Sequence, residues 1–207
     1  MLHKTKGIAL KTTNYSESSI VAHVFTEAFG MQSYLISGAK KPKAKIAANL
    51  FQPLHPLDMV VYHKDSGGLQ RIKEVHQLPV LREIPFDLTK RSLALFIDEI
   101  LYKVLRQQSP DPYLFHFIQQ AVLWMDSSQS SLANFHLLFL IKLSRFLGFL
   151  PSHHATKSFP YFDLLDGIFC NSLPAHSHIL QQPHTSLFER LLKTGFEGGL
   201  ILKFRIY

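Results

Sequence analysis

The sequence predicts an α+β protein in which a small five-stranded antiparallel β-barrel precedes an all-helical C-terminal domain. The first eighty residues contain short runs rich in β-branched and aromatic side chains, separated by turn residues. From Pro85 onward the apolar residues recur with the spacing of amphipathic helices. A chain of 207 residues can bury more than one core. We therefore expect one domain at residues 1–81 and a second at residues 82–207.

The five predicted strands are separated by turn signals and by one longer excursion. They are residues 7–13, 19–26, 31–38, 58–63 and 69–75. The last two are joined by Lys64-Asp-Ser-Gly-Gly, a strong hairpin signal, and the excursion before them includes a possible short helix at residues 44–51. Five short antiparallel strands with such an excursion are typical of an OB-like barrel. Its interior is expected to contain Ile20, Val24, Phe25, Leu35, Val60 and Ile72.

The second domain begins with an amphipathic helix whose apolar positions run from Leu93 to Leu105. Asp111 can cap the next helix, with Pro112 at its first position. Residues 132–147 are apolar on nearly every face, which predicts the central helix of the domain. Residues 153–183 predict an ordered loop region with little regular structure, and residues 185–194 predict one more short helix.

The most basic segment is a loop between the third and fourth strands. Lys40, Lys41, Lys43 and Lys45 lie within six residues, and no acidic residue occurs from Phe29 to Leu57. Residues 1–81 contain ten Lys and Arg against five Asp and Glu, whereas residues 82–207 contain twelve against ten. A polyanion is therefore expected to bind the N-terminal domain, with these lysines contacting phosphates.

Further binding candidates lie on the predicted strands. Arg71 and Lys73 are two residues apart and so share a face, where they would extend the basic surface across the barrel. Lys6 and Lys11 are weaker candidates of the same kind. Four aromatic side chains are candidates for stacking on bases, although strand aromatics more often belong to a core: Tyr15, Phe29, Tyr34 and Tyr62.

Several motifs, taken in order, resemble the RecO family of bacterial recombination mediators. The N-terminal motifs are Tyr15-x-Glu17-Ser18, Thr26-x-x-x-Gly30, Gly38-Ala-Lys-Lys and Leu50-Phe-Gln-Pro-Leu. The helical motifs are Glu99-Ile-Leu, Asp111-Pro-Tyr-Leu-Phe and Leu147-Gly-Phe-Leu-Pro. The resemblance covers residues 1 to about 151 and is carried by the order and spacing of the motifs. Members generally continue into further helices, so it also predicts a truncated or divergent C-terminal tail here.

The resemblance implies a DNA-binding protein without cofactor that anneals complementary strands and helps load recombinase on single-stranded DNA. The implied partners are single- and double-stranded DNA, RecR, the acidic C-terminal tail of single-stranded DNA-binding protein and, indirectly, RecA. A hydrophobic groove ringed by Lys or Arg would suit that acidic tail, but the sequence does not indicate its residues. We expect a cytoplasmic protein that associates with the nucleoid.

Several relatives hold zinc through four cysteines just after the last of these motifs. This chain has one cysteine, Cys170, so it lacks that finger and any internal disulfide. Six possible ligands remain, namely His153, His154, Cys170, His176, His178 and His184. Because their spacing fits no compact site, we expect no metal. We expect the aromatic and aliphatic residues at 159–169 to form a small apolar core instead, and Asp163-Leu-Leu-Asp-Gly to form a turn.

Enzymatic activity has little support, since no P-loop, dinucleotide-binding turn, paired-histidine zinc motif or nucleophile elbow is present. The N-terminus has no apolar signal segment, and the apolar run at residues 135–150 is interrupted by His136, Lys142 and Arg145. Three other hypotheses stay open: an OB-type binder of RNA or a ribosomal partner, an assembly adaptor whose lysines contact an acidic protein, and a metal-dependent hydrolase.

Overall fold

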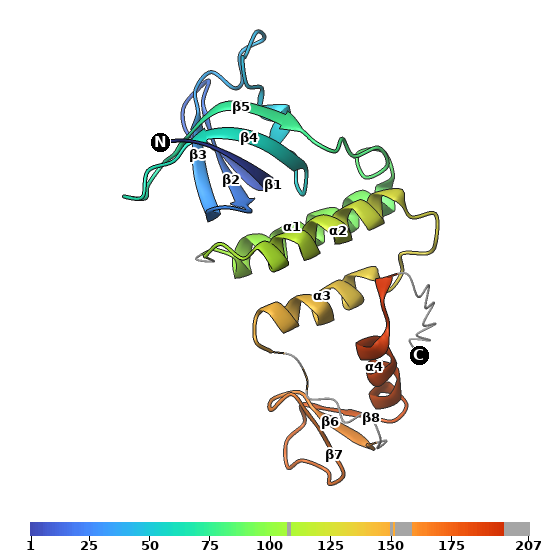
Figure 1. The fold of residues 1–207 in the computed structure, drawn as a ribbon. Helices are drawn as coiled ribbons and strands as arrows, with labels where there is room; N and C mark the ends of the chain where they lie inside the picture. The colour runs from blue at the N-terminus through green and yellow to red at the C-terminus, as the bar shows by residue number, and fades with distance from the viewer. Residues whose placement is uncertain (107–108, 150, 152–158, 197–207) are drawn as a thin grey trace. The chain divides into compact units, whose positions relative to one another are not determined.

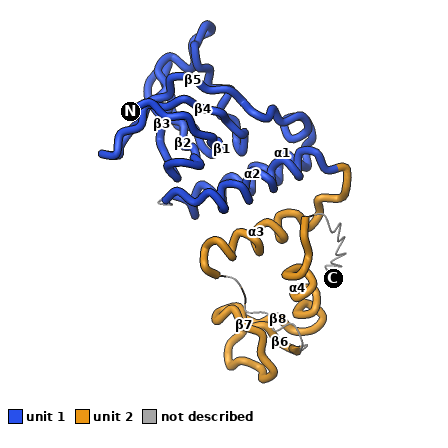
Figure 2. The backbone as a smooth tube through the Cα atoms, in the orientation of Figure 1, with its two compact units in different colours: residues 1–128 blue, residues 129–207 orange. Residues whose placement is uncertain are grey.

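The computed structural model describes residues 1–106, 109–149, 151 and 159–196 (Figure 1). The chain divides into two compact units, residues 1–128 and 129–207 (Figure 2). The first unit contains a five-stranded sheet and two helices, whereas the second contains two helices and a small three-stranded sheet. None of the described helices is both long enough and apolar enough to cross a membrane.

The N-terminal sheet is antiparallel, with its strands in the order β3-β2-β1-β4-β5. The strands are β1 (Leu2–Asn14), β2 (Ile20–Thr26), β3 (Gly30–Ile36), β4 (Pro56–Tyr62) and β5 (Arg71–Gln77). Between β3 and β4, the helix expected at residues 44–51 is reduced to one 3-10 turn, η1 (Ala48–Phe51). All five predicted strands are therefore confirmed, and β1 is longer than its apolar pattern indicates.

The prediction of a closed barrel is wrong, because the sheet remains open between its edge strands β3 and β5. A single parallel bridge joins Tyr34 of β3 to Gln70, the residue before β5. At this bridge the Leu35 amide donates to the Gln70 carbonyl at 3.0 Å, and the Gln70 amide donates to the Ser33 carbonyl at 2.8 Å. The register then shifts at Lys73, and such a bulge bends its strand. The two edges therefore do not continue as a ladder beyond Gln70.

The sheet encloses an apolar core on its inner face. Its buried residues are Ala9, Ile20, Ala22, Val24, Tyr34, Ile36, Ala39, Phe51, Leu57, Met59, Val61 and Val75. Ile20 and Val24 are placed as predicted, and Ile72 packs against the core from its edge. The predictions for Leu35 and Val60 are wrong, because the buried positions of β3 and β4 alternate one residue out of phase with the expected pattern.

The outer face of the sheet packs against two helices, α1 (Leu88–Val104) and α2 (Pro112–Ser127). Phe25 is fully buried on this face, and its ring lies 6.1 Å from that of Phe115 of α2. The predicted start of α2 is confirmed, since the Asp111 carboxylate accepts a hydrogen bond from the Leu114 amide at 3.0 Å and Pro112 occupies the first turn. Asp87 caps α1 in the same way.

One buried carboxylate connects these helices to the segment that leaves the sheet. Asp126 of α2 accepts hydrogen bonds at 2.9 Å from three successive backbone amides, those of residues 82–84. The Lys90 ammonium donates to the Asp126 carbonyl at 2.7 Å. Charge-assisted bonds of this kind are stronger than neutral ones. They fix the path of the chain between β5 and α1, and therefore the position of α1 relative to the sheet.

The prediction of an all-helical C-terminal domain is wrong, because the second unit contains three short strands beside α3 (Phe135–Phe146) and α4 (His184–Lys193). They are β6 (Tyr161–Asp163), β7 (Ile168–Cys170) and β8 (Ile179–Gln181), in the order β7-β6-β8. Strands of three residues are too short to show alternation in a sequence. Their aromatic core is formed by Phe159, Phe162, Phe169 and Phe188.

The buried Asp98 of α1 makes the stability of the first unit depend on pH. Burial raises the pKa of Asp98 to about 8, although a backbone hydrogen bond with Leu54 lowers it by a smaller amount. The Oδ1 atom of Asp98 has no hydrogen-bond partner. The folded protein therefore retains a proton that the unfolded chain releases near pH 4. The stability contributed by the protonated carboxyl is fully present below that pH and is lost as the pH rises to about 8.

We predict that Asp98→Asn removes the pH-dependent part of the free energy of unfolding that Asp98 contributes. The measurement is urea unfolding between pH 4 and pH 9. The free energy of unfolding of the wild type should fall relative to the variant by on the order of 1 kcal/mol per pH unit across the window. The variant should therefore be clearly more stable at pH 9 and similar to wild type near pH 4. Parallel curves for the two proteins would show that Asp98 is ionised in the folded state.

Candidate nucleic-acid interface

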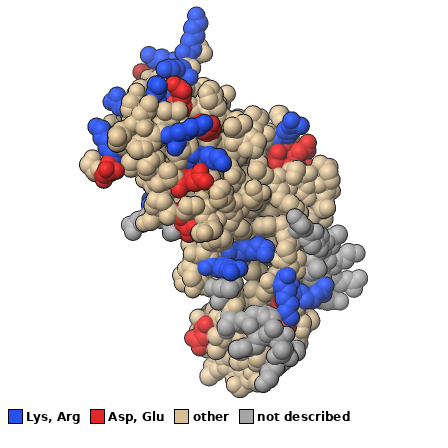
Figure 3. Space-filling view, in the orientation of Figure 1, with Lys and Arg blue, Asp and Glu red and all other residues tan. Residues whose placement is uncertain are grey.

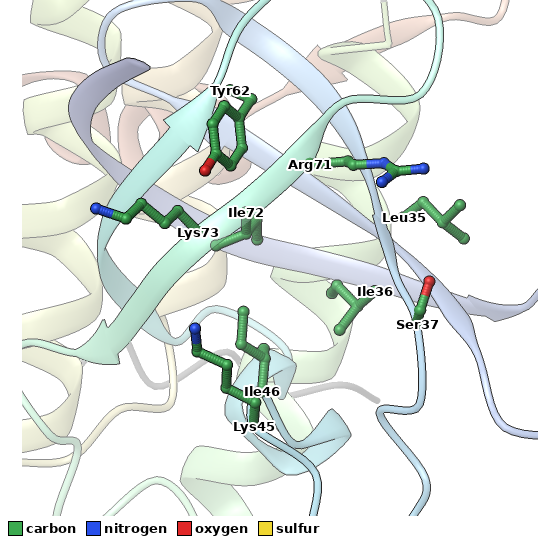
Figure 4. Close-up of a pocket in the computed structure, with 9 residues that line it drawn as sticks. All are labelled: Leu35, Ile36, Ser37, Lys45, Ile46, Tyr62, Arg71, Ile72 and Lys73. Atoms are coloured by element: carbon green, nitrogen blue, oxygen red, sulfur yellow. The ribbon is translucent and has the colours of Figure 1, made fainter.

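A groove with a volume of about 340 Å³ lies where the two sheet edges remain unpaired (Figure 4). It is lined by Leu35, Ile36, Ser37, Lys45, Ile46, Tyr62, Arg71, Ile72 and Lys73. The lining therefore comes from β3, the basic loop, the end of β4 and β5. It combines three cations with apolar side chains and contains no carboxylate. Such a groove can neutralise phosphates while its apolar and aromatic groups contact bases.

Three of the six predicted contact residues, Lys45, Arg71 and Lys73, line this groove. Arg71 pairs with Tyr62 on β4, and Ile72 pairs with Val61 of the core, so Arg71 lies on the side of β5 away from the core, whereas Lys73 occupies the bulge. Figure 4 shows their side chains diverging on either side of Ile72. Lys73 lies 3.4 Å from its neighbour Glu74, but both side chains are about half exposed, so this ion pair is weak.

The other predicted lysines, Lys40, Lys41 and Lys43, are exposed on the same loop but do not line the groove. The loop backbone is nevertheless anchored. The Lys40 amide donates to the Ser18 carbonyl and the Lys41 amide to the Gly38 carbonyl, both at 3.1 Å, and Ala39 is buried in the core. No ion pair joins these lysines to a carboxylate in the described ranges of the chain. They are available to phosphates beyond the groove. Figure 3 shows Lys and Arg gathered over the sheet of the first unit.

The four candidate stacking aromatics have different environments. Tyr34 is fully buried in the core, so it cannot stack on a base, and burial raises the pKa of its hydroxyl. Phe29 is already stacked on His63, with ring centroids 3.9 Å apart. Tyr15 is exposed but does not line the groove, whereas Tyr62 is 48% exposed and lines it. Tyr62 is therefore the one candidate of the four that the structure places beside the cations.

The sequence analysis missed the residues that shape the groove. Leu35 was expected in the core, yet it lines the groove, and Ile46 gave no signal beyond being apolar after a lysine run. Gln70 was not singled out, although it is 2% exposed and its backbone holds the two edges together. Its side chain also bonds to the Lys64 amide at 3.0 Å and to the Lys64 carbonyl at 3.1 Å.

The described histidines do not assemble a metal site, and no group of three or more potential ligands occurs within the described ranges. Asp163 forms the predicted turn, accepting from the amides of Leu165 and Asp166. Its other oxygen lies 3.0 Å from His176 Nε2. Burial raises the pKa of Asp163, but the two amides and His176 outweigh it, so the pKa lies below its usual value. His153 and His154 lie outside the described residues.

The N-terminal sheet is open, and the groove between its edges is basic and lined by no carboxylate. These features define a class of protein, namely an OB-like module that is followed by helices and has a surface suited to a polyanion. Two family models match the chain. Recombination protein O N terminal matches residues 1–78, and Recombination protein O C terminal matches residues 85–197. The chain belongs to the RecO family of DNA repair and recombination proteins.

Similarity to curated relatives extends over most of the chain. The chain is 34% identical to a DNA repair protein RecO of Phocaeicola vulgatus, over 95% of this chain and 82% of the relative. It is 35% identical to the Bacteroides fragilis protein of that name, again over 95% of this chain and 82% of the relative. The corresponding Flavobacterium johnsoniae protein is 32% identical, over 95% of this chain and 81% of the relative.

Gln70 generates a testable prediction about the groove. In Gln70→Ala the hairpin at residues 63–70 loses its side-chain hydrogen bonds, and the net cost of losing one such bond is about 1 kcal/mol. Amides in that hairpin and the Leu35 amide should exchange with solvent faster, measured by hydrogen–deuterium exchange. Gln77→Ala is the matched control, because Gln77 makes a single bond to the Leu50 carbonyl. Unchanged exchange in Gln70→Ala would show that the Gln70 side chain does not stabilise the hairpin or the bridge to β3.

Proposed function

We propose that the protein binds DNA through the groove between β3 and β5 and acts as a recombination mediator. In this role it anneals complementary strands and helps load recombinase on single-stranded DNA during recombinational repair. The observation that carries the proposal is that Lys45, Arg71, Lys73 and Tyr62 line one groove together with apolar side chains, and that no carboxylate lines it. Family membership supports the context of DNA repair. No covalent chemistry and no cofactor are required.

The mechanism we infer is electrostatic. A single strand lying along the groove places phosphates near the three cations, while the exposed Tyr62 and the half-buried Leu35 contact its bases. The exposed Lys40, Lys41 and Lys43 would contact phosphates of the same strand or of a second one. Neutralising charge on both strands lowers their repulsion, which favours pairing. Because these are backbone contacts, we expect weak sequence preference and strong dependence on salt. Both single- and double-stranded DNA are therefore ligands in this proposal.

We further propose that the chain works in two functional parts, residues 1–81 for DNA and residues 82–207 for partners, in the cytoplasm and associated with the nucleoid. The proposed partners are RecR, the acidic C-terminal tail of single-stranded DNA-binding protein, and RecA indirectly. A second groove, of about 450 Å³, supports a site for the acidic tail. It is lined by apolar residues that include Ile84, Phe86 and Leu95, together with Arg91.

The first experiment measures binding of single-stranded DNA across a salt series, for wild type and for Lys45→Gln/Arg71→Gln/Lys73→Gln. Loss of three phosphate contacts should weaken binding and reduce the slope of log affinity against log salt by about 2. Lys4→Gln/Arg82→Gln/Lys193→Gln is the matched control, since it removes the same charge from exposed positions outside this groove. Equal losses in the two variants would contradict a site in the groove and indicate a general charge effect.

The same proteins are then compared in annealing of two complementary labelled strands, with Lys40→Gln/Lys41→Gln/Lys43→Gln as an additional variant. We expect both the groove variant and the loop variant to anneal more slowly than wild type, because each removes phosphate contacts. Annealing at the wild-type rate by both would contradict the proposed mechanism.

For the second groove, we predict that Arg91→Gln weakens binding of a short acidic peptide ending in Phe. The guanidinium is positioned by a 2.9 Å hydrogen bond to the Pro85 carbonyl, beside the exposed Phe86 ring. Losing one charge-assisted contact should reduce affinity about tenfold, measured by fluorescence anisotropy. Arg82→Gln is the control, and equal affinity in wild type and Arg91→Gln would place the peptide elsewhere.

A further inference from the structure

A second cationic cluster lies on the outer face of the sheet, away from the residues that line the β3–β5 groove. The Lys11 ammonium of β1 lies 4.7 Å from the centroid of the Tyr102 ring of α1. The Arg106 guanidinium, just after α1, lies 5.5 Å from the same ring. Neither cation forms an ion pair with a carboxylate of the described part of the chain. One aromatic ring therefore holds two positive charges that have no direct counter-charge.

A β-bulge aims Lys11 at this ring. Ala9 pairs with Val24 on the inner face, and simple alternation would point Lys11 into the core as well. The register shifts between these two residues, so Lys11 pairs with His23 on the outer face instead. Bulges commonly re-aim a side chain in this way. The position of Lys11 is therefore built into the sheet and is not the result of a flexible surface side chain.

The neighbours of this cluster include a histidine, a serine and two carboxyl groups of α1. His23 lies edge-on to Tyr102, with centroids 5.4 Å apart, and its Nδ1 lies 2.9 Å from the Ser33 hydroxyl. Burial lowers the pKa of His23, and the charges of Lys11 and Arg106 lower it further. The charges of Lys11 and Arg106 therefore act on the His23 ring. Two carboxyls act on Lys11 from α1, namely Asp98, which is buried, and Glu99, which pairs with Lys103 at 3.0 Å.

We propose that Lys11, Tyr102 and Arg106 form a second phosphate-contact site, which binds the backbone of the nucleic-acid strand that occupies the β3–β5 groove. This inference rests on the proposed function of that groove. The outer face of β3 connects the two places, because Ser33 bonds to His23 of the cluster and Leu35 lines the groove. Residues two apart on one strand lie about 7 Å from each other on the same face.

The charges at this place favour an anion. The C-terminus of α1 contributes about half a negative charge through the helix dipole, against two full positive charges from Lys11 and Arg106. The Glu99 carboxylate is offset by its own ion pair with Lys103 at 3.0 Å. Tyr102 fixes the separation of the cations, so less side-chain freedom is lost when a phosphate binds. A nucleic-acid strand that leaves the groove across β3 would reach this site next. The surface that contacts nucleic acid would therefore extend beyond the groove.

The test compares oligothymidylates of about 6 and about 20 nucleotides, because one OB-type fold contacts about 4–16 nucleotides. Lys11→Gln/Arg106→Gln should bind the short oligomer as wild type does. It should bind the long oligomer several-fold more weakly, with the salt slope reduced by about 1.4 for two lost contacts. Lys4→Gln/Arg82→Gln removes equal charge elsewhere and should bind both lengths as wild type does. Tyr102→Phe should retain the length effect, whereas Tyr102→Leu should reduce it.

A second readout separates phosphate binding from a purely structural role. A phosphate beside Lys11 and Arg106 offsets the charges that lower the pKa of His23, so the long oligomer should raise this pKa in an NMR titration and the short one should not. Binding of both lengths by Lys11→Gln/Arg106→Gln at wild-type affinity, or an unchanged His23 pKa in the wild-type complex, would overturn the site. Failure of wild type to bind the short oligomer would contradict the groove itself.

Discussion

The architecture of the candidate site depends on one residue, Gln70, that joins the two edges of the open sheet at a single point. Gln70 bonds through its backbone to Ser33 and Leu35 of β3, and through its side chain to the hairpin at Lys64. This arrangement brings the two edge strands together without pairing them along their length. A fully paired edge would bury Leu35 and Ile72 and leave no groove. One bridge therefore gives both a defined sheet and an open edge beside three cations.

The basic loop is held by the same core that supports the sheet. Ala39 is buried, and Ile46 packs against the core from the far end of the loop. Between them, the lysine side chains are exposed while the backbone is hydrogen-bonded. A loop anchored in this way presents its charges from a fixed base, so less conformational entropy is lost when phosphates bind. The interface therefore combines a fixed groove with exposed lysines at its margin.

The sequence predicted the elements whose signals are local. Asp111 before Pro112 predicted a helix start because the capping carboxylate and the following proline act within a few residues. Lys45 was predicted from the density of lysines in its loop, and Arg71 and Lys73 from the alternation of side chains along a strand. The phase of β4 was predicted wrongly because both of its alternating sets contain apolar residues. Local pattern does not decide which set faces the core.

Features that depend on contacts between distant residues could not be predicted. The open edge depends on Gln70 meeting β3 and on the bulge at Lys73, neither of which has a pattern in the sequence. The cluster of Lys11, Tyr102 and Arg106 joins residues about ninety positions apart through the packing of α1 on the sheet. The strands β6–β8 are each three residues long, which is shorter than the span over which alternation can be recognised.

The most direct test of the central claim is photo-crosslinking of single-stranded DNA to a photoreactive phenylalanine analogue placed at position 62. Tyr62 is 48% exposed in the groove, whereas Tyr113, at 82% exposed, lies outside its lining and serves as the reference position. A salt-sensitive adduct formed at position 62 and not at position 113 is the predicted result. Equal adducts at both positions, or an adduct at position 113 alone, would contradict the placement of DNA between β3 and β5.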